Sequence, residues 1–240
     1  MPSLQPKIVP VTELSAATTD AMFSLFSRYY ERADEARFRR DLANKQTAII
    51  LRDETGKLGG FSTLRVLEPH EIARPCRILY SGDTVVDKRF WGNKALQRGF
   101  TRFMFRERYR HPITPLYWLL TTKGYRTYLL LARYFNDAYP RYDRATPTVV
   151  SELMNHIGHL RYGDHYDDSV GVIRHGGALD RLKPGVADIQ AADLTEPHIK
   201  FFAQANPGHQ NGDELLCLAR IHKVDPVRIG FNLMRRRLTK

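Results

Sequence analysis

A strand that runs through a short basic turn into a long helix is the feature that most constrains this sequence. Arg77–Val86 (RILYSGDTVV) is rich in the apolar, aromatic and β-branched residues that favour strands. The turn after it is basic and contains a glycine, and residues 94–109 then show the apolar spacing of a helix. The helix ends where His111 and two nearby prolines follow. A strand joined to a helix in this way predicts an α/β fold.

The remaining elements are expected to surround this unit. Before it we expect helices over 12–43 and a hairpin of strands 47–52 and 58–67, and then a proline-containing loop over 68–75. After it we expect a buried strand over 116–122 and a helix over 124–136. This order predicts a mixed central sheet flanked by helices over residues 1–145. Residues 146–240 are expected to form a C-terminal elaboration packed on this core, with helices over 149–160 and 196–205 and a strand over 170–174.

Composition excludes several classes of protein. The 42% of hydrophobic residues suits a packed core, and no repeat or low-complexity tract appears. The two cysteines lie far apart without a CxxC pattern, so neither a disulfide framework nor a zinc site is expected. No signal-like segment or 18-residue apolar run occurs, which favours a cytoplasmic protein. The acidic stretch Asp164, His165, Asp167 and Asp168 is interpreted as a solvated loop, and no metal is expected.

The chain carries 37 Lys and Arg against 26 Asp and Glu, a net charge of +11, which favours anionic partners. Part of this charge lies on one helix. The basic residues at every fourth position, which drift by only about 40° per step around a helix, are Lys94, Arg98, Arg102, Arg106 and Arg110. The stripe is interpreted either as a solvated face or as a contact for an acidic partner, since no acidic residue four positions away relieves its repulsion. Leu96, Phe100 and Phe103 lie away from the stripe and are expected to face the sheet.

The basic turn itself suits a phosphate group. The N–H groups at the start of a helix have no intrahelical acceptor, and the helix dipole adds positive charge. Lys88, Arg89 and Lys94 supply cations nearby, and Gly92 lets the backbone approach an anion closely. The spacing fits neither a Walker P-loop nor a dinucleotide fingerprint. The alternative interpretation is an ordinary solvated connection.

In this context the chain resembles the GNAT superfamily of acyl-CoA N-acyltransferases. The donor motif of that superfamily, [Arg/Gln]-x-x-Gly-x-[Gly/Ala], is matched by Arg89 and Gly92, whereas Lys94 departs from it and Ala95 comes one place late. The resemblance covers residues 12–143. It implies that a strand pairs with the donor's pantetheine arm and that the loop binds its phosphates. The donor-binding residues that it implies are Thr84, Val85, Val86, Lys88, Arg89, Trp91, Gly92, Asn93, Lys94 and Ala95.

The resemblance also implies a strand carboxylate that acts as a base and a tyrosine that acts as an acid. Asp83 precedes Val85 by two residues and is the candidate base, and Ser81 is expected to share its face and to orient the acceptor. Tyr134 is the candidate acid, with Tyr128 and Tyr139 as competitors. Each of these residues has an ordinary structural role as its alternative. Trp91 is expected either to stack on the donor or to anchor the loop.

The predicted function is therefore transfer of an acyl group from an acyl-CoA, or from the phosphopantetheine of an acyl carrier protein, to a small-molecule amine. Two alternatives stay open. The first is a nucleic-acid-binding protein that uses the basic helix 94–110, and the second is a GNAT-like binding module without catalysis. An acidic carrier protein is a possible partner. The basic tail, 234–240, makes an anionic membrane surface another.

Overall fold

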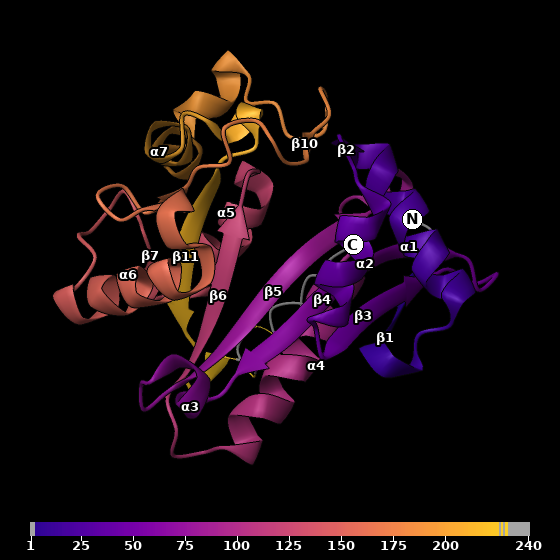
Figure 1. Ribbon diagram of the computed structural model, residues 1–240, viewed down its shortest axis with the longest axis horizontal. Coiled ribbons are helices and arrows are strands. Elements are labelled where there is room, and N and C mark those ends of the chain that lie inside the picture. Colours follow the sequence, from indigo (N-terminus) through magenta and orange to yellow (C-terminus); the bar gives the residue numbers. More distant parts are fainter. Residues whose placement is uncertain (1–2, 226, 228, 230–240) are drawn as a thin grey trace, which may run out of the picture.

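Most strands of the molecule belong to one mixed sheet (Figure 1). The computed structural model describes residues 3–225, 227 and 229. Within them, the order across the sheet is β1-β3-β4-β5-β6-β11-β9-β8, and β7 pairs with β11. The strands of this sheet are β1 (Gln5–Pro10), β3 (Thr47–Arg52), β4 (Leu58–Leu67), β5 (Arg77–Val86), β6 (Leu116–Thr122), β7 (Ala138–Tyr139), β8 (Tyr166–Asp167), β9 (Val172–Ile173) and β11 (Glu214–Arg220). The β5–β6 pair is parallel and the other pairs are antiparallel.

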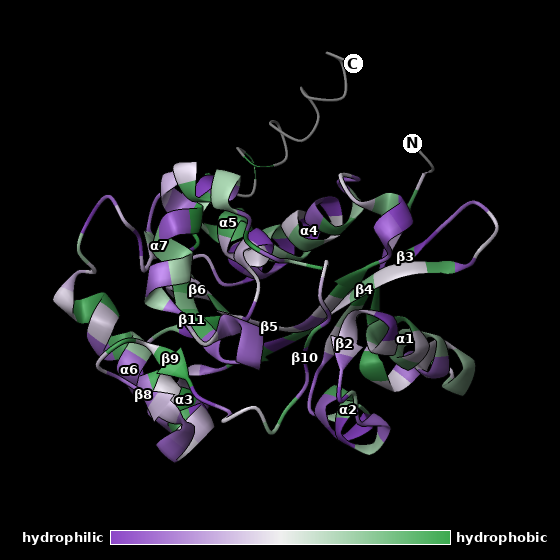
Figure 2. Cartoon of the chain, turned by 90° about the horizontal axis from the view of Figure 1, so that it is seen from above, coloured by the Kyte–Doolittle hydropathy of each residue, from purple (hydrophilic) through white to green (hydrophobic). Residues whose placement is uncertain are grey.

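Helices cover both faces of the sheet (Figure 2). One face carries α1 (Ala16–Tyr29), α2 (Glu35–Ala43), α3 (Pro69–Ile72) and α6 (Thr148–Tyr162). The other carries α4 (Ala95–Arg110), α5 (Tyr125–Tyr134) and α7 (Pro197–Ala205). The predicted α/β fold, a mixed central sheet flanked by helices, is confirmed.

Several predicted elements differ in detail from the observed ones. The expected helical region 12–43 is two helices separated by a short strand, β2 (Tyr30–Glu31), which pairs with β10 (Arg181–Leu182). Asp34 then begins α2 by accepting a hydrogen bond from the Arg37 N–H at 2.6 Å. The expected loop 68–75 contains the single-turn helix α3. The strand expected over 170–174 is only the two-residue β9.

Among the strands that were not predicted from the sequence, β1 and β11 are the longest. β1 contains two prolines, and it is tolerated because it lies at the edge of the sheet, where a missing N–H leaves no ladder position empty. β11 is a short apolar run, ELLCLAR, and such runs do not distinguish strand from helix by their pattern. It lies between β6 and β9. Residues beyond 146 therefore extend the same sheet.

Helix α4 packs directly on the sheet. The Cα of Gly99 approaches so closely that a Cβ there would lie 2.7 Å from the Ile49 side chain on β3. Phe103 is buried, and Leu96 and Phe100 pack against the same core, so the face predicted to meet the sheet is confirmed. The close approach fixes the start of α4 relative to the end of β5.

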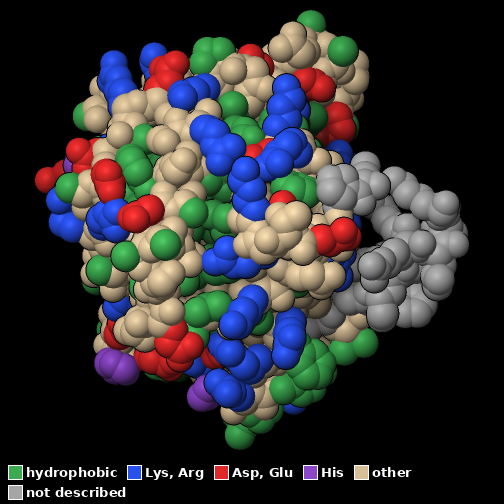
Figure 3. All heavy atoms as spheres, turned by 90° about the vertical axis from the view of Figure 1, so that its right-hand side faces the viewer, with side chains coloured by type: hydrophobic (Ala, Val, Ile, Leu, Met, Phe, Trp, Pro, Cys, Tyr) green, Lys and Arg blue, Asp and Glu red, His purple; other side chains and the backbone are tan. Residues whose placement is uncertain are grey.

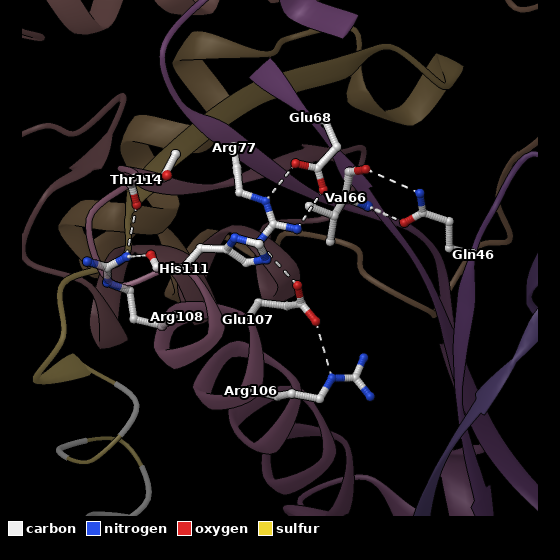
Figure 4. Close-up of polar contacts among 9 residues, drawn as sticks. All are labelled: Gln46, Val66, Glu68, Arg77, Arg106, Glu107, Arg108, His111 and Thr114. Carbon is white, nitrogen blue, oxygen red and sulfur yellow. Dashed lines mark hydrogen bonds and ion pairs between the residues drawn. The ribbon is translucent and has the colours of Figure 1, made fainter. Parts of the chain in front are cut away.

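A polar network holds the lower ends of β5 and β6 beside α4 (Figure 4). Arg77, at the start of β5, makes two hydrogen bonds to Glu68, at 2.9 and 2.6 Å, and one to the buried Glu107 of α4, at 3.3 Å. Arg108 donates to the carbonyls of His111, Pro112 and Thr114. These carbonyls follow the helix end, so the arginine fixes the turn that leads from α4 to β6.

Candidate active site

Strands β5 and β6 separate part of the way along their length. Their parallel pairing runs from Arg77 opposite Leu116 to Ser81 opposite Leu120 and then stops. β5 continues to Val86, but within the described residues its part beyond Ser81 pairs only with β4. The ribbons diverge at this point in Figure 1. The second edge of residues 82–86 therefore offers backbone N–H and C=O groups for pairing with an extended ligand.

A β-bulge accompanies the separation. Ser62 of β4 lies opposite Thr84 and Leu64 lies opposite Ser81, so two steps along β4 match three along β5. The extra residue lies at positions 82–83. Bulges bend a strand and increase its twist, which explains why β5 leaves β6 here.

The bulge overturns the prediction that Ser81 and Asp83 share a face. Ser81 faces α4 and α5, where its Oγ accepts a hydrogen bond from Trp118 Nε1 at 2.9 Å. Asp83 faces α2, where Lys45 and Asp41 are among its charged neighbours. In a regular strand, residues two positions apart face the same side, so alternation places Ser81 and Asp83 together. The extra residue of the bulge puts them on opposite faces of β5. Both nevertheless line the cleft at the strand opening.

The separated strands border a cleft of about 470 Å³. It is lined by the ends of β5 and β6, the basic turn, and residues from α1, α2, α4 and α5. Of the predicted donor-binding residues, it includes Thr84, Val85, Val86, Trp91, Gly92 and Asn93. The Val85 side chain is buried against α1 and α2, so Val85 can contribute only its backbone. Lys88, Arg89, Lys94 and Ala95 lie in or next to the same turn, outside this lining.

The turn has a defined local structure. Asp87 begins a short 3₁₀ helix, Lys88–Phe90, by accepting from the Arg89 N–H, and it also receives two hydrogen bonds from the Arg89 side chain, at 3.0 and 3.2 Å. Burial opposes ionisation of Asp87, but these bonds hold its pKa below the usual range. Trp91 Nε1 donates to the Val86 carbonyl at 2.9 Å, which anchors the loop. Gly92 has a φ of 85°, a conformation that glycine adopts without strain.

The start of α4 faces the cleft. Asn93 Oδ1 accepts from the Ala95 N–H at 2.8 Å, so one first-turn donor is already occupied. The next two N–H groups, of Leu96 and Gln97, have no acceptor within the part of the chain that the structure describes. Both residues line the cleft. This end of α4 therefore has backbone donors suited to an anion.

One cation beside the turn was missed by the sequence analysis. Arg126, in the first turn of α5, lies over the Trp91 ring at 4.7 Å and lines the cleft. Lys88 lies 5.9 Å from the same ring. Trp91 thus holds two cations near the turn, in addition to the anchoring of the loop that was one of the two roles expected for it. No local motif contains Arg126, because only the tertiary fold brings α5 next to the loop.

Asp83 has the pKa expected of a general base that works near neutral pH. Burial, with smaller contributions from the like charges of Asp180 and Asp41, raises its pKa to about 6, although Lys45 and Lys123 oppose the shift. It lines the cleft on the face towards α2. Its carboxylate is therefore largely ionised at pH 7, yet basic enough to accept a proton.

The candidate acid lies on the opposite face. Tyr134 borders a smaller pocket between α4, α5 and the sheet, together with Ser81 and Thr84. Its competitors are less suitable. Tyr128 is fully buried with its hydroxyl donating to the Pro140 carbonyl, and burial raises its pKa. Tyr139 is buried and is not part of either pocket lining. The β5–β6 opening lies between Asp83 and Tyr134.

The acidic stretch on the far side of the molecule is engaged internally. Asp167 pairs with Arg174 at 2.8 Å and accepts from Ser169, and Asp168 contacts His159 at 3.0 Å. Among the described residues, no group of three or more His, Cys, Asp or Glu side chains could hold a metal ion.

The basic stripe of α4 divides into two parts. Near its start, Arg98 donates to the Leu4 carbonyl at 3.2 Å. Farther along, Arg102, Arg106 and Arg110 line a groove of about 660 Å³ against β1, with the exposed rings of Phe105 and Tyr109 and with Lys7. Arg106 has an acidic partner after all, Glu107 at 3.2 Å, one position away instead of four. Figure 3 shows how Lys and Arg side chains gather on the side of the molecule at the right of Figure 1.

The basic tail over 234–240, for which a contact with an anionic membrane was expected, lies outside the described residues. Of the helices in the described part of the chain, none is long and apolar enough to cross a membrane.

Comparison with known proteins gives a likeness of fold. No family model and no curated protein matches the chain. Solved structures that match it include the GNAT family N-acetyltransferase YhbS from Escherichia coli in complex with CoA, at 15% identity and a TM-score of 0.36, over 51% of this chain and 66% of that one. An acyl-CoA N-acyltransferase from Pseudomonas aeruginosa matches at 17% identity and a TM-score of 0.40, over 55% and 85% of the two chains. ElaA from Escherichia coli matches at 13% identity and a TM-score of 0.40, over 60% of this chain and 95% of that one.

The cleft itself, and not these likenesses, is the basis for the function proposed for this chain.

Proposed function

We propose that this protein is an N-acyltransferase that moves an acyl group from the thioester of an acyl-CoA to an amine. The observation that carries the proposal is the combination found in one cleft: an unpaired edge of β5, a basic turn at a helix start, and an aspartate with a raised pKa. The unpaired edge suits the two amides of a pantetheine arm. The turn suits its pyrophosphate.

The chemistry needs no nucleophile from the protein. The amine nitrogen attacks the thioester carbonyl and forms a C–N bond, and the C–S bond then breaks to release the thiolate of CoA. Asp83 accepts the proton that the amine loses, and Tyr134 donates a proton to the thiolate and regains one from solvent. The products are an amide and free CoA. Positioning supplies much of the rate, because both substrates are held in one cleft.

The charges on the acceptor side favour an amine. Asp41, Asp83, Asp180 and Glu214 all line the cleft. Lys123 is held by Asp180 at 2.9 Å and Glu214 at 3.3 Å. The other carboxylates, Asp41 and Asp83, are available to attract a protonated amine, which then loses its proton to the base.

The donor loop can be tested by a double substitution. Arg89→Ala with Lys94→Ala is expected to weaken acyl-CoA binding about tenfold, because two cations near the phosphate site are removed. Isothermal calorimetry with acetyl-CoA measures the change. Arg102→Ala with Arg110→Ala removes the same charge from α4, farther from the turn, and is the matched control. If both doubles bind with native affinity, the assignment of the loop is wrong.

Tyr134→Phe tests the acid. Loss of the hydroxyl is expected to lower kcat about 10²-fold with little change in the dissociation constant of acyl-CoA, since the ring remains in place. Release of free thiol in the presence of a panel of amines measures the rate. Tyr142→Phe, at an exposed tyrosine, is the control. Equal rates for the two variants would remove Tyr134 from the mechanism.

A carrier protein is the second donor that the surface favours. The groove of Arg102, Arg106 and Arg110 lies on the helix that begins at the donor turn, and its charge complements an acidic protein. We propose it as a docking site for an acyl carrier protein. The Arg102→Ala, Arg110→Ala double should weaken binding of an acyl carrier protein while leaving acyl-CoA binding intact. Salt-sensitive binding of RNA or DNA by the native protein, with no binding of the carrier, would favour the nucleic-acid alternative instead.

A further inference from the structure

A second, smaller pocket lies beneath the cleft, between α4, α5 and the sheet. Its volume is about 60 Å³, and its walls are mostly apolar. They are formed by Ser62, Ser81, Thr84, Leu96, Gln97, Phe100, Thr101, Met104, Trp118, Leu120, Thr127, Leu130, Tyr134, Phe135 and Ile229. The sequence analysis assigned no ligand to this place.

The pocket adjoins the cleft and shares lining residues with it. Ser81, Thr84 and Leu120, at the point where β5 and β6 separate, line both spaces. The residues that α4 contributes then advance along the helix from Gln97 to Met104, which is about 10 Å at 1.5 Å per residue. A chain that enters at the start of α4 and passes the strand opening would therefore continue into this pocket.

The walls of the pocket suit a hydrocarbon. The ring of Trp118 packs against Phe100, with centroids 4.6 Å apart, and against Phe135 at 5.4 Å. Its indole N–H is already donated to Ser81, so this wall presents no free donor. Met104 is buried at the far end of the α4 wall. An apolar cavity of this kind is filled favourably by an aliphatic group.

Two polar atoms in the pocket are unsatisfied. Gln97 Oε1 and Thr101 Oγ1 are buried and have no hydrogen-bond partner among the described residues. An unpaired buried polar atom is costly, so a partner supplied by a ligand would be favourable. Gln97 lines both spaces, and its Oε1 can accept from an amide N–H of the pantetheine arm just before the acyl group.

We infer that this pocket receives the acyl chain of the donor and sets its length; the inference rests on the proposed function. A cavity of about 150 Å³ holds benzene, or about 25 Å³ for each carbon, so 60 Å³ holds about two to three carbons. The thioester carbonyl lies at the strand opening, and the carbons beyond it occupy the pocket. The preferred donor is therefore a short straight-chain acyl-CoA, propionyl or butyryl, ahead of acetyl.

The test is a series of dissociation constants for CoA and for acetyl-, butyryl- and octanoyl-CoA, measured by calorimetry on the full chain without acceptor. Each buried methylene is expected to tighten binding about fourfold, so butyryl-CoA, with two more methylenes, should bind about 15-fold more tightly than acetyl-CoA. Octanoyl-CoA should gain nothing further. Met104→Ala enlarges the pocket and should move the optimum to longer chains, and Thr101→Leu should abolish the gain from butyryl.

Ile113→Ala, at an exposed position just beyond the end of the same helix, is the control and should leave the profile unchanged. If Met104→Ala fails to fold, Thr101→Leu still tests the pocket, because the larger leucine side chain fills part of it. Affinities that do not depend on chain length, with CoA bound normally, would overturn the inference and leave the proposed donor intact. If CoA itself does not bind, the proposed function fails and the acyl pocket fails with it.

Discussion

Replacing Asp83 by Asn is expected to lower kcat at pH 7.5 by about 10²–10³-fold, with the dissociation constant of acyl-CoA nearly unchanged. The amide has the size of the carboxyl but cannot accept the proton that the attacking amine loses. Asp83 lines the cleft on the α2 side, away from the turn that is proposed to bind the donor phosphates. Thiol release measures the rate and calorimetry the binding. Native kcat in this variant would exclude Asp83 as the base.

The pH dependence gives a second measurement of the same residue. The base must be ionised, so activity should be low below its pKa of about 6, rise through that pH and then level off. Asp41→Asn is the matched control. Because the Asp41 charge raises the pKa of Asp83, its removal should move the rising limb to lower pH without abolishing activity. If the rising limb of the pH–activity profile lies at the same pH in the native protein and in Asp41→Asn, the group that titrates is not Asp83.

Replacing Asp83 by Asn should also stabilise the fold. The pKa of Asp83 rises from 3.8 to about 6 on folding, so the folded state holds the proton more tightly than the unfolded one. Asp83 therefore does not lower the free energy of unfolding below pH 3.8. Above that pH it lowers the free energy of unfolding by an amount that grows until the pH passes about 6. At neutral pH the difference corresponds to about 3 kcal/mol at most. Urea unfolding should show Asp83→Asn more stable at pH 7.5 and equal to the native protein at pH 3.5.

The sequence was sufficient for what depends on neighbouring residues. The β5–turn–α4 unit is local: a β-prone run, a glycine with a positive φ and an amphipathic helix follow one another within 34 positions, Arg77 to Arg110. The apolar face of α4 could be predicted for the same reason. The hairpin of β3 and β4 also depends on a short turn between two strands.

The sequence was insufficient where a partner strand or helix decides the outcome. The bulge at positions 82–83 exists only in the register of β5 against β4, so the faces of Ser81 and Asp83 could not be told from alternation. Arg126 reaches the donor turn only because α5 packs beside α4. β11 becomes recognisable only as the neighbour of β6. The proposed acyl pocket has walls from five separate elements, β4, β5, β6, α4 and α5, and no signature in any of them.

Arg77→Met is expected to lower the free energy of unfolding by about 3–5 kcal/mol, the typical cost of removing one member of a buried ion pair. Arg77 is buried and pairs with Glu68 at 2.6 Å and with the buried Glu107 at 3.3 Å (Figure 4). Without the guanidinium, the one ion-pair partner that Glu107 keeps among the described residues is Arg106, at 3.2 Å. Its charge would then be poorly compensated in a site that water hardly reaches.

The position of this network explains why the effect matters for the cleft. Arg77 begins β5 at the end where β5 and β6 still pair, and its N–H donates to the Pro115 carbonyl at 2.8 Å. The strands can separate at Ser81 because the other end is held against α4. Urea unfolding measures the loss, and Arg65→Met is the matched control. Arg65 pairs with Glu71 at 2.6 Å in a partly exposed position, so its loss should cost less than about 1 kcal/mol.

A double substitution separates the charge from the packing. Arg77→Met with Glu107→Leu removes both buried charges and keeps similar volume, so it should recover most of the stability lost in Arg77→Met. If the double is no more stable than the single, the cost comes from lost packing or from Glu68 and not from an unpaired Glu107. If Arg77→Met costs no more than Arg65→Met, the network does not hold the paired end of the two strands, and the opening at Ser81 must depend on the bulge alone.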